Sequence, residues 1–115
     1  MHKVKQYCTG SSYKALMDDN LLLDIRENDE FDKVKFDVPH ILHIPYSEIH
    51  GRYNEIPRDR PIIVASSYGK TGAKISKMLL NKGFINVSNL EDGLSKWLYK
   101  RYPVLGDKFF DLRKE

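Results

Sequence analysis

The chain has 115 residues, of which 41% are hydrophobic and 30% charged, and its formal net charge is +3. This length predicts a single domain over residues 1–115, whose core needs neither a disulfide nor a metal. The mild positive charge is compatible with anionic ligands. Because lysines and arginines alternate with acidic residues, however, we expect no nucleic-acid partner.

The N-terminal segment and the cysteine count indicate the compartment. MHKVKQYC lacks the apolar stretch of a signal peptide, and no apolar run approaches the roughly 18 residues of a membrane span. Cys8 is the only cysteine, so an internal disulfide is excluded. We therefore predict a cytoplasmic protein that does not bind membranes, and we interpret Cys8 as an ordinary surface or half-buried thiol.

The first third of the chain predicts two helical segments around one strand. Ser11 and Ser12 precede apolar residues at helical spacing, which indicates a serine-capped helix in YKALMDDN. Leu21–Ile25 is a short apolar run typical of a buried strand. Asn28 follows in a polar stretch and is expected to cap a single helical turn.

The middle of the chain predicts two further strands. HILHI, between Pro39 and Pro45, fits a short extended segment, and Ser47 is expected to cap a helix that ends before Pro57. Pro61–Ser66 is a continuous β-branched run and indicates a central strand.

The last third alternates in the same way. GAKISKMLLNKG has one apolar helical face, with Gly83 at the position of a left-handed stop. FINVSNL predicts a strand, and Asp92 is expected to cap the helix in DGLSKWLYKRY. No element is assigned to FFDLRKE. Alternating strands and helices predict an α/β fold, a small parallel sheet flanked by helices on both faces.

Ligands of such sheets bind at the carboxyl ends of the strands, where the loop SSYGKTG follows Ala65. Two interpretations of this loop fail. Gly69-Lys70-Thr71 resembles the end of a phosphate-binding P-loop, but the required first glycine is Val64. The same loop resembles the nucleophile turn of a serine hydrolase, but the base must follow the serine, and the last histidine, His50, precedes it.

A third interpretation covers most of the chain. LLLDIRENDEF, FDVPHILHIPYSEI and IPRDRPIIVASSYGKTGAKISKMLLNKGFINVSNLEDGLSKW resemble, in order and spacing, the conserved segments of the rhodanese-like domain family. The resemblance extends from Leu21 to about Val104. It implies the rhodanese-like fold and a sulfurtransferase scaffold, in which a cysteine at a strand end takes a sulfane sulfur as a persulfide.

The position that matches the family's cysteine is Ser66. Amide groups at a helix N-terminus lower the pKa of a thiol, whereas a serine hydroxyl without an adjacent base stays neutral, and an oxygen atom cannot form a persulfide. We therefore predict a non-catalytic anion-binding or protein-interaction module. The alternative is a rhodanese-type sulfurtransferase whose active-site cysteine has been replaced by Ser66. A phosphatase-like site is disfavoured because its cysteine and following arginine are both absent.

The resemblance implies an anion-binding loop in which successive amides point at one spot. Its residues are Ser67, Tyr68, Gly69, Lys70, Thr71 and Gly72. The family usually has Arg-Ser where this chain has Thr71-Gly72, which argues against the family's substrate selectivity. Asp24 and Arg26 match the family's D-x-R, and we interpret them as supporting residues.

The expected partner is a small anion (sulfate, thiosulfate or phosphate) or an unknown protein. We predict no cofactor. We also predict no metal site, because His40 and His43 face opposite sides of an extended segment and do not converge with His50.

Overall fold

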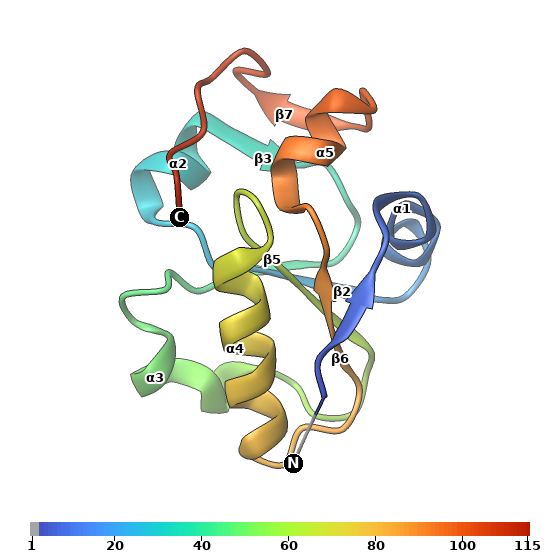
Figure 1. Ribbon diagram of the computed structural model, residues 1–115, viewed down its shortest axis with the longest axis vertical. Coiled ribbons are helices and arrows are strands. Elements are labelled where there is room, and N and C mark those ends of the chain that lie inside the picture. Colours follow the sequence, from blue (N-terminus) through green and yellow to red (C-terminus); the bar gives the residue numbers. More distant parts are fainter. Residues whose placement is uncertain (1–2) are drawn as a thin grey trace.

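A five-stranded parallel sheet forms the centre of the molecule, in a computed structural model that describes residues 3–115 (Figure 1). The strand order is β1-β6-β5-β2-β4, and every neighbouring pair is parallel. The strands are β1 (Lys5–Tyr7), β2 (Leu21–Asp24), β4 (Ile41–His43), β5 (Ile62–Ala65) and β6 (Val87–Leu90). A separate antiparallel pair joins β3 (Val34–Phe36) to β7 (Val104–Gly106). The α/β prediction is confirmed.

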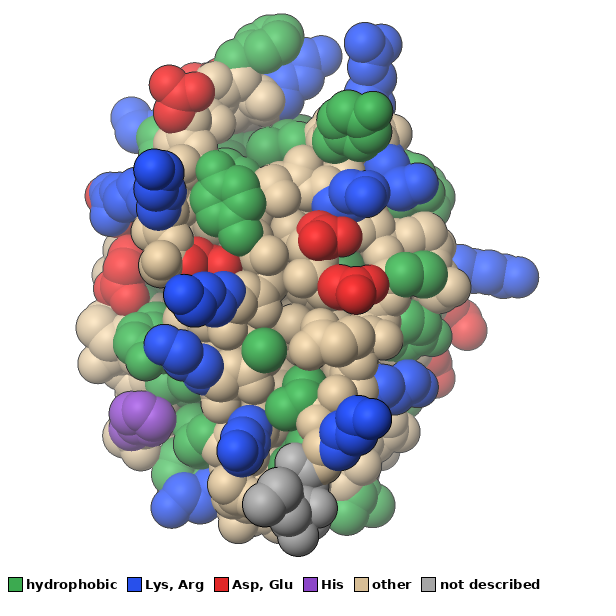
Figure 2. Space-filling view, viewed as in Figure 1, with side chains coloured by type: hydrophobic (Ala, Val, Ile, Leu, Met, Phe, Trp, Pro, Cys, Tyr) green, Lys and Arg blue, Asp and Glu red, His purple; other side chains and the backbone are tan. Residues whose placement is uncertain are grey.

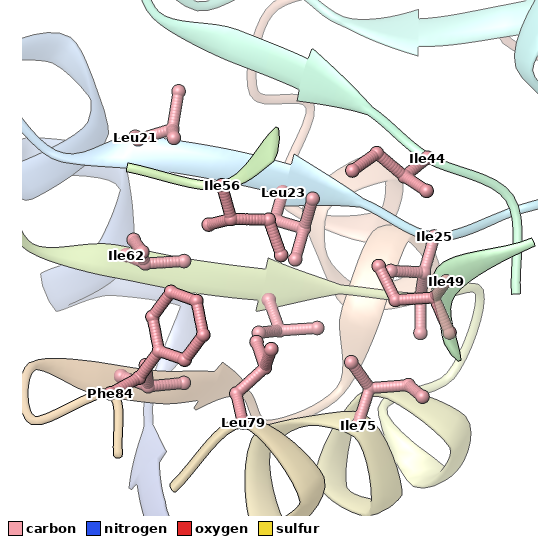
Figure 3. Close-up of a cluster of buried hydrophobic side chains, with 12 residues drawn as sticks. Leu21, Leu23, Ile25, Ile44, Ile49, Ile56, Ile62, Ile75, Leu79 and Phe84 are labelled. Atoms are coloured by element: carbon pink, nitrogen blue, oxygen red, sulfur yellow. The ribbon is translucent and has the colours of Figure 1, made fainter. Parts of the chain in front are cut away.

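Helices cover both faces of the sheet. They are α1 (Thr9–Met17), α2 (Asn28–Lys33), α3 (Ile49–Arg52), α4 (Lys70–Asn81) and α5 (Gly93–Tyr99), with a 3-10 turn, η1 (Tyr53–Glu55), after α3. Side chains of α3 and α4 pack on one face, in the cluster that Figure 3 shows around Leu23 and Ile75. Leu16 of α1 and Trp97 of α5 pack on the opposite face. The two faces thus have separate apolar cores.

The central strands are continuous apolar runs because they are covered on both faces. Every residue of β2 and β5 is buried, as expected for a parallel sheet between two helical layers. The predicted strands at Leu21–Ile25, HILHI, Pro61–Ser66 and FINVSNL are all present, each slightly shorter than its sequence run. Gly83 has φ +92° and ends α4 as predicted.

Three of the four predicted helix caps are wrong. α1 begins at Thr9, so Cys8, not a serine, is its N-cap residue. Glu27 takes the position expected for Asn28, and Glu48 the one expected for Ser47. The Ser47 side chain bonds instead to Glu27, which lies 20 residues earlier. Capping depends on where the preceding chain enters the helix, and tertiary contacts set that entry.

Strands β1, β3 and β7 were not predicted. Each has three residues and lies at the edge of its sheet, where a short run with partial burial carries little periodic signal. FFDLRKE forms neither helix nor strand. None of the helices within residues 3–115 has the length and apolar character that crossing a membrane requires. The first two residues of MHKVKQYC lie outside the described part of the chain.

Candidate functional site

The loop between β5 and α4 lies at the carboxyl edge of the sheet, beside the ends of β2 and β6. Its sharp turn depends on Gly69, which has φ +95°. A Cβ atom at this position would lie 1.9 Å from the carbonyl oxygen of Glu91. Only glycine therefore lets the loop fold against the end of β6 and direct its amides outward.

Ser66 lies at the floor of the loop and is 3% exposed. Its Oγ accepts hydrogen bonds from the backbone N–H groups of Gly69 and Gly72, both at 3.0 Å. Gly72 is in the first turn of α4, so the helix dipole acts in the same direction as the two amides. A negative charge on the atom at this position would be stabilised.

Three other amides of the loop bind a different acceptor. The N–H groups of Tyr68 and Lys70 donate to Oε2 of Glu115, at 3.2 and 2.9 Å, and that of Thr71 donates to Oε1 at 3.3 Å. The expectation that the loop amides point at one spot is therefore wrong. They divide between an inner acceptor, Ser66 Oγ, and an outer one, the Glu115 carboxylate. Here "cradle" denotes the three outer amides.

The start of α5 holds the loop through two backbone hydrogen bonds. The N–H groups of Leu94 and Ser95 donate to the carbonyl oxygens of Ser66 and Ser67, both at 2.9 Å. Gly93 makes this approach possible, since a Cβ there would lie 2.3 Å from the Ser66 carbonyl oxygen. Asp92 is the N-cap residue of α5, as predicted, although its side chain makes no cap hydrogen bond.

Asn89, on β6, is a second support that the sequence did not reveal. Its Nδ2 donates to the Gly69 carbonyl oxygen at 2.9 Å. A Cβ on Gly72 would lie 2.4 Å from Asn89 Oδ1. The amide side chain therefore occupies the space beside Gly72, which explains why this chain has glycine there. The only sequence signal was a polar residue inside an apolar strand.

Asp24 and Arg26 form a buried ion pair at the end of β2, next to the loop. Arg26 Nη2 lies 3.0 Å from Asp24 Oδ2, and their side chains are 1% and 0% exposed. The guanidinium also donates to the carbonyl oxygens of Glu30 and Val34. The pair thus ties β2 to α2 and β3 and fixes one wall of the site.

A cavity of about 380 Å³ opens in front of the loop. Its polar lining includes Ser66, Ser67, Thr71, Glu30, Lys74 and Glu115. Glu30 is 6% exposed, and its Oε2 has no hydrogen-bond partner. Lys74, one turn beyond Lys70 on α4, was not predicted, whereas Lys70 itself is exposed outside this lining. A larger cavity, about 520 Å³, lies between α5 and the segment after β7, away from the loop.

Within residues 3–115, the histidines and the surface charges form no second candidate site. His43 Nε2 donates to the Arg26 carbonyl oxygen at 2.7 Å, and its ring stacks on Phe31. Among the described residues, no group of three or more His, Cys, Asp and Glu could hold a metal ion. Figure 2 shows Lys and Arg side chains scattered over one face with acidic groups among them. In the described part of the chain, the loop amides are therefore the most organised group of donors for an anion.

Comparisons with known proteins place this geometry in a family. The family model of the rhodanese-like domain matches residues 9–100. A sulfurtransferase of Allochromatium vinosum is 30% identical over 88 residues, which cover 76% of this chain and 80% of the relative. The adenylyltransferase and sulfurtransferase UBA4 of Meyerozyma guilliermondii is 30% identical over 69% of this chain, but the chain spans only 20% of its length.

A solved structure shows the same fold. The crystal structure of a rhodanese-related protein from Thermoplasma volcanium superimposes with a TM-score of 0.81 at 23% identity, covering 90% of this chain and 99% of that one. The two proteins therefore share the fold over 90% of this chain.

Proposed function

The chain belongs to the rhodanese-like sulfurtransferase family, and from this premise we propose that it binds anions at the β5–α4 loop without transferring sulfur. In this proposal, Ser66 stands at the position of the family's nucleophilic cysteine, and the loop from Ser67 to Gly72 keeps the anion-binding role. The ligand is a small oxyanion or a carboxylate presented by a protein.

The chemistry of sulfur transfer supports this assignment. The nucleophile must be a thiolate, which attacks a sulfane sulfur and retains it in an S–S bond. Ser66 offers oxygen, with no base bonded to it: its Oγ accepts from two backbone amides. Cys8, the only thiol, lies at the end of β1, which is an edge strand separated from β5 by β6. The loop therefore has no sulfur atom with which to start the reaction.

The observation that carries the anion-binding part is the carboxylate of Glu115 on three loop amides. This contact supports the proposal because both oxygens of an anionic group lie within hydrogen-bonding distance of the cradle. Sulfate, thiosulfate and phosphate present oxygens at similar spacing. Lys74 lines the same cavity and adds a positive charge.

The decisive measurement is thiocyanate formation from thiosulfate and cyanide. We expect no turnover by the chain itself and measurable turnover by Ser66→Cys, because the Gly69 and Gly72 amides and the α4 dipole would stabilise a thiolate there. The control is Cys8→Ser in the Ser66→Cys background, which should leave the new activity unchanged. Turnover by the unmodified chain would instead favour the alternative, an active sulfurtransferase.

Binding is measured separately. Titration with sodium sulfate should shift the amide resonances of Tyr68, Lys70 and Thr71, with an affinity that weakens as ionic strength rises. Resonances of the η1 turn, which contributes no residue to the lining of the cavity in front of the loop, serve as the internal control. If no loop resonance moves, the chain is not an anion-binding module.

A further inference from the structure

We propose that the C-terminal segment 107–115, here called the tail, is an intrachain ligand that occupies the cradle and must leave before an external anion can bind. The inference rests on the proposed function and adds its regulation. It is built on contacts between the tail and three separate parts of the molecule.

The tail is guided to the loop by contacts along its length. The Asp107 N–H donates to the Lys33 carbonyl oxygen at 2.7 Å, which holds the start of the tail beside the end of α2. Phe110 and Leu112 are partly buried and pack against the apolar core beneath α1 and α5. Figure 1 shows the tail descending from β7 past α2 and ending next to the loop that precedes α4.

Two further contacts fix the last residues. Arg113 forms an ion pair with Asp29 of α2. The Tyr68 hydroxyl donates to the Leu112 carbonyl oxygen at 3.3 Å. Tyr68 thus binds the tail with its side chain and, through its N–H, binds Glu115. In this proposal, the exposed aromatic side chain of the loop helps to hold the tail.

The contact at the end of the tail is specific for an anion. Glu115 places one oxygen on two amides and the other on a third, at the N-terminus of the 12-residue helix α4. A neutral side chain would lose the attraction of the helix dipole. The Asp111 carboxylate, four residues earlier, makes no such contact and is exposed. The position of the carboxylate in the tail therefore decides whether it contacts the cradle, and the net charge of the tail does not explain the contact.

External anions compete for the same donors. Sulfate, thiosulfate or phosphate cannot use the N–H groups of Tyr68, Lys70 and Thr71 while the carboxylate occupies them. The apparent dissociation constant is then the intrinsic value divided by the fraction of molecules whose cradle is open. Glu115, Arg113 and Asp29 are solvent-exposed, so the closed state is favoured only modestly. An open fraction of roughly a tenth to a third corresponds to about three- to tenfold weaker binding.

The test compares Glu115→Ala with Asp111→Ala in the full chain. Each removes one carboxylate from the tail, but only the first removes a cradle contact. Without added anion, Glu115→Ala should shift the Tyr68, Lys70 and Thr71 amide resonances and increase the fast motion of residues 112–115. Asp111→Ala should leave both unchanged. Unshifted loop resonances in Glu115→Ala would overturn the proposal, whatever the anion-binding result.

Sulfate titration then tests competition. Glu115→Ala should bind sulfate about three- to tenfold more tightly than the unmodified chain and Asp111→Ala. In the unmodified chain, sulfate should also shift resonances of residues 112–115 as the tail leaves. Equal sulfate affinity in all three proteins would overturn the tail proposal but leave the anion-binding function standing. If none of the three proteins binds sulfate, both the anion-binding function and the competition between sulfate and Glu115 are refuted. The spectra recorded without sulfate then still show whether the tail occupies the cradle.

Discussion

Two strand-to-helix junctions of this chain lie at the same carboxyl edge of the sheet, yet the side chains of Ser66 and Cys8 at these junctions have different surroundings. At the β5–α4 junction, the Ser66 oxygen is buried and accepts two backbone amides. At the β1–α1 junction, the Cys8 thiol is exposed and donates one hydrogen bond, to Ser11 Oγ at 3.3 Å. The sulfur atom of Cys8 is thus exposed to solvent, whereas the oxygen atom of Ser66 is enclosed by the β5–α4 loop.

The difference follows from the position of each strand. β5 is the central strand, so its end is surrounded by β2, β6 and the start of α5, which supply the hydrogen bonds that shape the loop. β1 is an edge strand with one neighbour, and its junction faces solvent on the other side. A residue at a strand end becomes a site only when adjacent elements complete its surroundings.

The largest effect is expected from removing support beneath the central junction. Arg26→Ala leaves the Asp24 carboxylate buried without its partner and should lower the free energy of unfolding by roughly 3–5 kcal/mol. Urea denaturation measures the loss. The matched control is Arg52→Ala, which breaks ion pairs with Glu48 and Glu55 that are open to solvent and should leave the urea midpoint nearly unchanged. Similar losses of unfolding free energy in both variants would show that the buried ion pair stabilises the fold no more than the exposed ones.

Glycine substitutions compare the two junctions directly. Gly69→Ala forces a Cβ onto a residue with φ +95° and toward the Glu91 carbonyl oxygen, so stability should fall by about 2 kcal/mol or more. Gly10→Ala, in the first turn of α1, meets only the Tyr102 hydroxyl at 3.9 Å and should stabilise the protein by about 0.5–1 kcal/mol. Thermal unfolding of the pair should show shifts of opposite sign.

Hydroxyl removal is a smaller test. Ser66→Ala leaves the Gly69 and Gly72 amides without their acceptor in a buried site, at a cost of about 1–3 kcal/mol. Ser11→Ala acts at the exposed junction and should change stability by less than about 0.5 kcal/mol. Chemical denaturation measures the free energy of unfolding of both variants. A larger loss in Ser11→Ala than in Ser66→Ala would contradict the expected difference between the two junctions.

The smallest effect concerns the reactivity of Cys8. The Ser11 hydroxyl, which donates to the sulfur once the thiol is ionised, is the main cause of the lowered pKa of the Cys8 thiol, and partial desolvation and the Glu91 carboxylate oppose it. Ser11→Ala should let that pKa rise toward its ordinary value, so less thiolate is present at pH 7–8 and iodoacetamide reacts roughly two- to threefold more slowly. Above the pKa, both proteins are fully ionised and the rates should converge. Equal rates at neutral pH would show that the hydroxyl does not act on the thiol.

Sequence analysis predicted the elements whose buried residues follow a regular spacing along the chain. The apolar run before Ser66 and the helical spacing of Ile75 and Leu79 identified β5 and α4 because a strand covered on both faces and an amphipathic helix impose their own periods. Knowing where a parallel strand ends was enough to place Ser66 at the edge where ligands bind.

Three of the four helix caps and the supports of the loop could not be predicted in this way. Asn89 lies 20 residues after Gly69, to whose carbonyl it donates, and Glu115 lies 44 residues after Thr71, from which it accepts. The sequence around one of these residues therefore does not predict its hydrogen-bond partner. Such pairings exist only once the chain has folded.

The sequence by itself determined an α/β domain of this family, with an oxygen atom at the end of its central strand. Tertiary structure alone decided which two amides donate to that oxygen and that a distant carboxylate accepts from three others. The reason is physical: burial is encoded by the spacing of neighbouring residues, whereas the choice of hydrogen-bond partner depends on which remote groups the fold brings within about 3 Å.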